Sequence, residues 1–176
     1  MSEQERVEDA IARAWELMRE ERAEKAVAIL RSLAEEFPRN ARAHFEYAGA
    51  LDFLGREEEA VDPYFRAAAL GLPAEDVPRL HVQLGSTLRN VGELEEAERL
   101  LAQGRSQFPD YAAIQAFHAL ALTSLGRTEE AVASLLELLV DRADSIDLDG
   151  YQRALREYAA DLRESATEGR VAIPEN

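Results

Sequence analysis

Residues 119–132 read ALALTSLGRTEEAV, and the same pattern stands at residues 48–61 (AGALDFLGREEEAV) and residues 84–98 (LGSTLRNVGELEEAE). Each copy contains a small residue, a leucine three positions later, a glycine, an acidic stretch and an alanine. The glycines Gly55, Gly92 and Gly126 are 37 and 34 residues apart. The alanines recur at 34, 37 and 34 residues: Ala26, Ala60, Ala97 and Ala131. A regular period of this length indicates a repeat protein built from one supersecondary unit.

The composition of this pattern predicts pairs of packed helices. Small residues at fixed positions let two helix backbones approach closely, and large residues one turn later fill the space between successive units. A glycine after an apolar helical segment supplies the left-handed conformation that ends a helix. The acidic residues after each glycine then fall in the first turn of the next helix, where they complement the helix dipole. We therefore interpret the acidic runs as structural rather than as a binding surface.

On these residues the chain resembles the tetratricopeptide repeat (TPR) family, whose unit is an antiparallel helix pair of about 34 residues. The small position of the first helix matches at Ala14, Ala48, Gly85 and Ala119, and the large position of the second helix matches at Leu30, Tyr64, Leu101 and Leu135. The first unit departs from the pattern, because Glu21 stands where the others have glycine. The resemblance extends over residues 7–145 and is greatest to small bacterial TPR proteins of unassigned function.

This resemblance implies an all-α fold, a right-handed superhelical solenoid of about four helix pairs. The repeat region, residues 1–145, divides into units at about 7–40, 41–74, 78–111 and 112–145. The bridge Leu70–Arg79 (LGLPAEDVPR) is longer than the others, and Pro78 within it is placed to begin a helix. Pro63 lies inside the predicted second helix of the second unit, which it should bend or loosen.

The pattern changes after Ser145. Apolar residues then recur at helical spacing, which predicts a capping helix over residues 146–165 that covers the open end of the fourth unit. They are Leu148, Tyr151, Leu155, Tyr158, Ala159 and Leu162. Residues 166–176 are expected to form a frayed tail.

The composition limits the classes of partner. The 176 residues include 35 Asp and Glu against 20 Lys and Arg, which gives a formal net charge of −15. Nucleic acid and anionic membranes repel such a surface, so we expect neither as a partner. The chain has no cysteine, which excludes disulfides and thiolate metal sites and fits a cytoplasmic location. Its charged N-terminus does not have the apolar core of a signal peptide.

Catalytic and cofactor motifs are absent from the sequence. The three histidines His44, His81 and His118 are 37 residues apart, a regularity that suggests a metal site. His44 and His81 occupy equivalent places in adjacent units, where the TPR family often has a large residue between helices. We therefore expect packed interhelical histidines, no metal, no cofactor and no enzymatic activity.

In TPR arrays the first helices of successive units line a concave groove, and the resemblance implies the same surface here. The predicted partner-binding residues are Trp15, Arg19, Arg42, Phe45, Asp52, Phe53, Arg79, Arg89 and Asn90. This set is rich in arginine in a strongly acidic chain, and Asp52 is its single acid. Arginine beside aromatic rings suits carboxylates with apolar anchors, so the first hypothesis is a scaffold that binds an acidic and apolar peptide or protein segment.

Two alternatives stay open at this stage. Arg19, Arg42 and Arg79 could simply pair with neighbouring acids, while Trp15 and Phe53 pack between helices. The chain could also be a self-associating module, most simply a homodimer, whose groove is covered by its own chain, since the apolar residues Ala113, Ala116 and Leu120 need cover. A peptide-sensing regulator is suggested by fold analogy alone.

Overall fold

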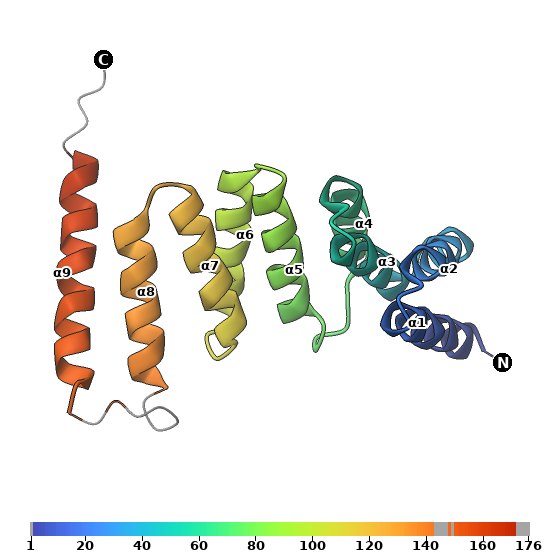
Figure 1. The fold of residues 1–176 in the computed structure, drawn as a ribbon, viewed down its shortest axis with the longest axis horizontal. Helices are drawn as coiled ribbons and strands as arrows, with labels where there is room; N and C mark the ends of the chain where they lie inside the picture. Colours follow the sequence, from blue (N-terminus) through green and yellow to red (C-terminus); the bar gives the residue numbers. More distant parts are fainter. Residues whose placement is uncertain (1, 143–147, 149, 172–176) are drawn as a thin grey trace, which may run out of the picture. The chain divides into compact units, whose positions relative to one another are not determined.

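A computed structural model of the chain describes residues 2–142, 148 and 150–171, and its regular secondary structure in that part is entirely α-helical (Figure 1). The chain divides into two compact units, residues 1–92 and 93–176, which are described separately below. Unit one contains α1 (Glu3–Arg19), α2 (Ala23–Glu36), α3 (Ala41–Phe53), α4 (Glu57–Leu70) and α5 (Val77–Asn90). Unit two contains α6 (Leu94–Gln107), α7 (Ala112–Ser124), α8 (Thr128–Asp141) and α9 (Gln152–Val171). Within each unit every helix packs against the next one along the chain, which confirms the predicted all-α repeat architecture.

The turns between paired helices have the left-handed backbone that the glycine spacing predicted. The φ angle is +70° at Gly55, +91° at Gly92 and +74° at Gly126. In the first pair Glu21 takes the same place with φ +59°. Among the residues that the structure describes, it is the only residue other than glycine with a positive φ angle. A side chain with a Cβ is strained in this conformation, so the first turn keeps the repeat geometry at a cost in free energy.

The repeating alanines form the core of the helix pairs. Ala26, Ala60 and Ala97 are 0% exposed and Ala131 is 2% exposed, which confirms the predicted small positions. The small positions of the first helices are also buried, at Ala14, Ala48, Gly85 and Ala119. Because these residues have at most one methyl group, the paired helices within a unit, α1 with α2, α3 with α4 and α7 with α8, can approach closely.

The residue at the large position of the second helix is not equally buried in the four repeats. Leu30, Tyr64 and Leu101 are each 0% exposed, because the next helix of the chain packs over them. Leu135, the equivalent residue of α8, is 39% exposed. The prediction that a large residue fills the gap to the following element therefore does not hold at the last repeat position.

The reason lies in the side of α8 on which α9 packs. Arg163 of α9 donates to Glu137 Oε1 at 2.7 Å and to Ser134 Oγ at 3.4 Å, which places α9 beside these two residues. Ser134 is buried, as are two neighbours on this side of the helix, Ala133 and Val140. The capping helix is present as predicted, but it leaves the side with Leu135 uncovered. It also continues to Val171, beyond the predicted end at residue 165.

Comparison with the preceding repeat shows how unusual this packing is. Ala133 and Val140 correspond to Arg99 and Ser106 of α6, one repeat of 34 residues earlier, and both of those residues are exposed. Thus α9 covers a helix face that faces solvent in the earlier repeat.

Arginine residues link the starts of the second helices to neighbouring acids. Arg56 Nε is 2.7 Å from Glu59 Oε1, and Arg56 Nη1 is 3.5 Å from Glu24 Oε2 of the preceding pair. Arg127 repeats the arrangement in unit two, 2.8 Å from Glu130 and 3.0 Å from Glu98. Glu59 and Glu130, which belong to the acidic runs, therefore form ion pairs with arginines at the start of their own helices.

The two prolines of the second and third repeats lie inside helices. Pro78 is in the first turn of α5, where its missing N–H costs nothing. Pro63 is in the interior of α4, which continues through it to Leu70.

We expect Glu21→Gly to stabilise the chain, because glycine adopts positive φ without the strain that the Glu21 side chain causes. The gain should be about 0.5–1 kcal/mol, since the strain relieved exceeds the entropy that glycine loses on folding. It is measured as a higher urea midpoint with an unchanged slope. The matched control is Glu20→Gly, because Glu20 has an ordinary φ of −83°. A stabilisation by the control as large as that of Glu21→Gly would contradict the explanation.

Ala60→Leu should destabilise unit one, because Ala60 has no exposed surface and a leucine would push the helices of its pair apart. Overpacking of this kind costs about 1–3 kcal/mol. The change is followed by thermal unfolding with circular dichroism detection. Ala68→Leu, at an exposed position of the same helix, should have little effect. Equal effects of the two substitutions would show that close helix approach at Ala60 is not required.

Candidate functional site

The first part of the predicted groove lies between α1 and α3. Trp15 Nε1–H donates to Glu46 Oε2 at 2.6 Å, and Glu46 is 4% exposed. Arg42 lies 3.3 Å from Glu8 and 3.8 Å from Glu46. A Cβ added at Gly49 would lie 3.8 Å from the Trp15 ring, so the indole rests against the α3 backbone. Trp15 and Arg42 thus join α1 to α3, as the structural alternative in the sequence analysis proposed.

The second part lies between α3, α4 and α5. Phe45 is 1% exposed, and its ring centroid is 5.9 Å from that of Tyr64. The Arg79 guanidinium lies over the Phe45 ring at 5.2 Å and is 3.1 Å from Asp76. The structure therefore places Phe45 in the core instead of on the binding surface. The predicted stripe of residues on α3 is wide enough to include core positions as well as surface positions. Helical spacing alone therefore assigned Phe45 to the groove.

Asp52 belongs to a partly buried polar cluster. The Tyr64 hydroxyl is 3.4 Å from Asp52 Oδ2 and 3.5 Å from Gln83 Oε1, so it can donate to either. Burial raises the pKa of Asp52, and the charge of Glu57 adds to this shift, while hydrogen bonding with Thr87 and Tyr64 opposes it. Burial and the neighbouring Asp52 carboxylate also raise the pKa of the Tyr64 phenol. The cluster connects α3, α4 and α5 and holds a carboxylate that is costly to keep charged.

Three predicted residues remain well exposed, and each is the last residue of its helix. Arg19 ends α1, Phe53 ends α3 and Asn90 ends α5, at equivalent positions of three successive repeats. We call these three residues the terminal row. Phe53 is 68% exposed, which is unusual for a phenylalanine in a folded chain.

The neighbours of the terminal row are polar. Arg89 Nη2 donates to Asn90 Oδ1 at 2.9 Å, and Asn90 Nδ2 donates to Glu57 Oε1 at 3.4 Å. The row therefore offers an apolar ring between a guanidinium and an amide. Such a surface can hold a polypeptide segment by one apolar anchor and polar contacts on both sides.

The sequence analysis did not identify several residues that organise this region. They are Glu8, Glu46, Gln83 and Thr87. Glu46 could have been found from its position one turn after Arg42, which predicts an i,i+4 ion pair. The others join helices that are distant in sequence, and no local pattern indicates them.

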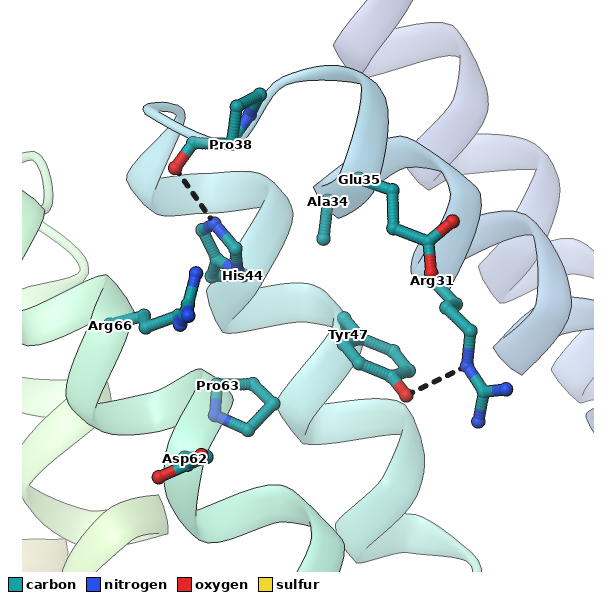
Figure 2. A pocket seen from close by; sticks show the side chains of 9 residues that line it. All are labelled: Arg31, Ala34, Glu35, Pro38, His44, Tyr47, Asp62, Pro63 and Arg66. Atoms are coloured by element: carbon teal, nitrogen blue, oxygen red, sulfur yellow. Dashed lines mark hydrogen bonds between the residues drawn. The ribbon is translucent and has the colours of Figure 1, made fainter.

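A separate pocket of about 460 Å³ lies between α2, α3 and α4 (Figure 2). Its walls include the apolar residues Ala34, Pro38, Tyr47 and Pro63. Arg31 Nε donates to the Tyr47 hydroxyl at 3.0 Å, and this bond raises the pKa of Arg31.

The charges around this pocket balance one another. Its rim carries two guanidinium groups, of Arg31 and Arg66, and two carboxylates, of Glu35 and Asp62. His44 closes one end, with Nε2 3.1 Å from the Pro38 carbonyl oxygen. A shallow pocket of this composition shows no preference for a charged ligand.

The histidines are packed in the interior, as the sequence predicted. His44, His81 and His118 are 5%, 6% and 5% exposed. In unit two, burial lowers the pKa of His118, whose Nε2 is 3.4 Å from Glu98 Oε1. Within residues 2–142, 148 and 150–171, no group of three or more histidine, aspartate or glutamate side chains is arranged to hold a metal ion. The described helices also include none with the length and apolar character of a membrane span.

We expect Asp52→Asn to stabilise unit one more at neutral pH than at acid pH. The native state binds the Asp52 proton more tightly than the unfolded state does, because its folded pKa is raised. The stabilisation that protonated Asp52 provides is fully present below the pKa of Asp52 in the unfolded chain. It is lost as the pH rises through the raised pKa of Asp52 in the folded chain. Asparagine cannot ionise, so it removes this loss while it keeps an oxygen that accepts from Tyr64.

The measurement is the difference in unfolding midpoint between variant and wild type from pH 4 to pH 7. Asp62→Asn, at an exposed position of α4, is the control and should give a difference that varies less with pH. The interpretation fails when the Asp52→Asn difference shrinks as the pH rises.

Two family models match the chain. A model described as Tetratrico peptide repeat matches residues 41–162, and one described as Tetratricopeptide repeat matches residues 17–62. Comparison with curated proteins gives no match.

Solved structures with the same fold cover nearly the whole chain. TPR-like repeats of Podosopora anserina, from a protein described as a kinesin light chain, align with a TM-score of 0.70, 20% identity and coverage of 93% of this chain and 90% of theirs. MamA from Desulfovibrio magneticus RS-1 aligns with a TM-score of 0.64, 16% identity and coverage of 96% and 97%. YrrB, described as a TPR protein with an unusual peptide-binding site, aligns with a TM-score of 0.63, 14% identity and coverage of 97% and 98%. At these identities the likeness shows the fold, and together with the family match over most of its length it establishes that the chain belongs to the tetratricopeptide repeat family.

Proposed function

We propose that the chain is a non-catalytic interaction module that binds a polypeptide segment across the terminal row of unit one. TPR domains generally bind protein partners, and this coarse role follows from the family. The exposed Phe53 is the observation that carries the finer proposal. A phenyl ring that is 68% exposed leaves apolar surface in water, and a bound apolar side chain would remove that surface from solvent.

The polar residues beside Phe53 indicate the kind of segment. Arg19 offers a guanidinium that can bind a carboxylate at one end of the row. Asn90 offers an amide at the other end, already oriented by Arg89 and Glu57. A segment with an apolar residue next to an acidic residue would match both features.

The internal ion pairs narrow the proposed surface. Arg42 and Arg79 are held by Glu46 and Asp76, so these two arginines support the fold more than they support binding. Phe45 is buried, so it contributes to the proposed surface only indirectly, through the contact of its ring with the Arg79 guanidinium. The proposed contact surface is therefore smaller than the sequence set, and it lies at the ends of α1, α3 and α5.

The test uses a displayed library of random peptides selected on the intact chain. Selected peptides should share an apolar residue beside an acid. Their affinity is then measured by fluorescence anisotropy for the wild type and for Phe53→Ala. Loss of an exposed aromatic anchor should weaken binding by about tenfold or more. Phe65→Ala, at another exposed phenylalanine, is the matched control and should bind as the wild type does.

Charge preference is tested on the same peptides. Arg19→Glu should weaken the binding of acidic peptides, whereas Arg13→Glu makes the same charge change on another face of α1 and should not. Equal binding by the Phe53→Ala variant and the wild type, or an equal loss for both charge reversals, would exclude the terminal row as the site.

A further inference from the structure

An apolar stripe on α8 is exposed in unit two. Val132, Leu135 and Leu139 are 41%, 39% and 40% exposed. They are three and four residues apart, so their side chains lie along one face of the helix. We call these three residues the open stripe. Thr128 and Arg142 continue the same spacing by one turn at each end, and both are exposed.

The open stripe is the face on which a TPR chain stacks its next repeat. Its central residue, Leu135, corresponds to Leu30, Tyr64 and Leu101, all fully buried by the helix that follows them. After α8 the following helix is α9, and it packs on the side of Ser134 and Glu137 instead. The stacking face is therefore formed and apolar, but α9 does not cover it.

The other repeats indicate what fits this face. At each earlier position the cover is a helix of the same chain, packed with its small and large residues against the second helix. A second copy of this chain carries helices of the same kind. The segment Ala131–Leu136 (AVASLL), at the centre of the stripe, has no charged residue, so the repulsion between two strongly acidic chains is weakest there.

We propose that the open stripe is a dimerisation surface on which α8 packs against α8 of a second copy, antiparallel and about a twofold axis near Leu135. The spacing is self-complementary in this arrangement, because Val132 on one side of Leu135 meets the partner's Leu139 from the other side. Closed twofold dimers are also the commonest homo-oligomers.

The charges at the helix ends favour the antiparallel orientation. The first turn of α8 is acidic, with Glu129 and Glu130, and Arg142 follows its last turn. An antiparallel pair opposes the two helix dipoles and places the acidic first turn of each helix beside the last turn of the other, where the charges of Asp141 and Arg142 balance. A parallel pair would bring like charges together.

The dimer should be weak. Three side chains that are about two-fifths exposed bury much less than the roughly 800 Å² per partner of a standard interface. We expect a dissociation constant on the order of 10–1,000 µM. Because the copies are acidic, added salt should strengthen the dimer by screening their repulsion.

Sedimentation equilibrium of the full chain from about 10 µM to about 1 mM tests the proposal. The wild type should shift from monomer towards dimer, and Leu135→Glu should remain monomeric. Leu120→Glu is the matched control, because Leu120 is a 47% exposed leucine of α7 in the same unit. A wild type that stays monomeric over this range, or a Leu135→Glu variant that associates as the wild type does, would overturn the proposal.

Cross-linking tests the geometry. The chain has no cysteine, so a single substitution introduces the only thiol. The Leu135→Cys variant should form a disulfide-linked dimer faster than the Leu120→Cys variant, because the twofold axis brings its two thiols together. The Val132→Cys and Leu139→Cys variants should cross-link faster when mixed than when oxidised separately. A parallel arrangement would give the reverse result for the last pair and would reject the antiparallel dimer.

This dimer is independent of the proposed peptide site. The open stripe lies in unit two and the terminal row in unit one, so Leu135→Glu should leave peptide affinity unchanged. Failure of one proposal therefore leaves the other standing.

Discussion

The close approach of two helix backbones at each repeating alanine is the constraint on which the rest of the structure depends. Ala26 and Ala60 have no exposed surface and Ala131 is 2% exposed, so the pairs α1–α2, α3–α4 and α7–α8 each have a spacing that a larger side chain would break. This spacing sets where the next pair can pack and which residue fills the gap between pairs. It also requires a sharp turn inside each pair. The chain keeps that turn even at Glu21, where a left-handed glutamate replaces glycine.

Regular stacking separates the side chains of a helix into those that hold the fold and those that are left for contact. In unit one most of the arginines and aromatic residues along the first helices are used internally, by Glu46, Asp76 and Tyr64. The last residues of the same helices, Arg19, Phe53 and Asn90, stay in solvent just before the turns to the second helices. A surface that differs from repeat to repeat, on a core that does not, is how repeat proteins acquire partners without a new fold.

Unit two shows what happens when the regular order stops. A repeat cannot bury its own stacking face, so the last one needs a cap with a polar outer surface or a partner. Here α9 is held by Arg163 on another side of α8, where Ala133 and Val140 replace the polar and charged residues of the preceding repeat. These substitutions make the alternative packing favourable, and they leave an apolar stripe open on the stacking face.

Much of this organisation could be predicted from the sequence, because a 34-residue period and helical spacing are local properties. The small positions, the glycine turns, the buried histidines and the all-α repeat fold follow from them. Tertiary structure alone decided which residues of the groove set are exposed. Phe45 and Phe53 both lie on the predicted stripe, yet one is in the core and the other is in solvent, since α4 and α5 cover only the first. It also decided the side on which α9 packs, because an amphipathic helix specifies that it needs an apolar surface but not which of two such surfaces it will take.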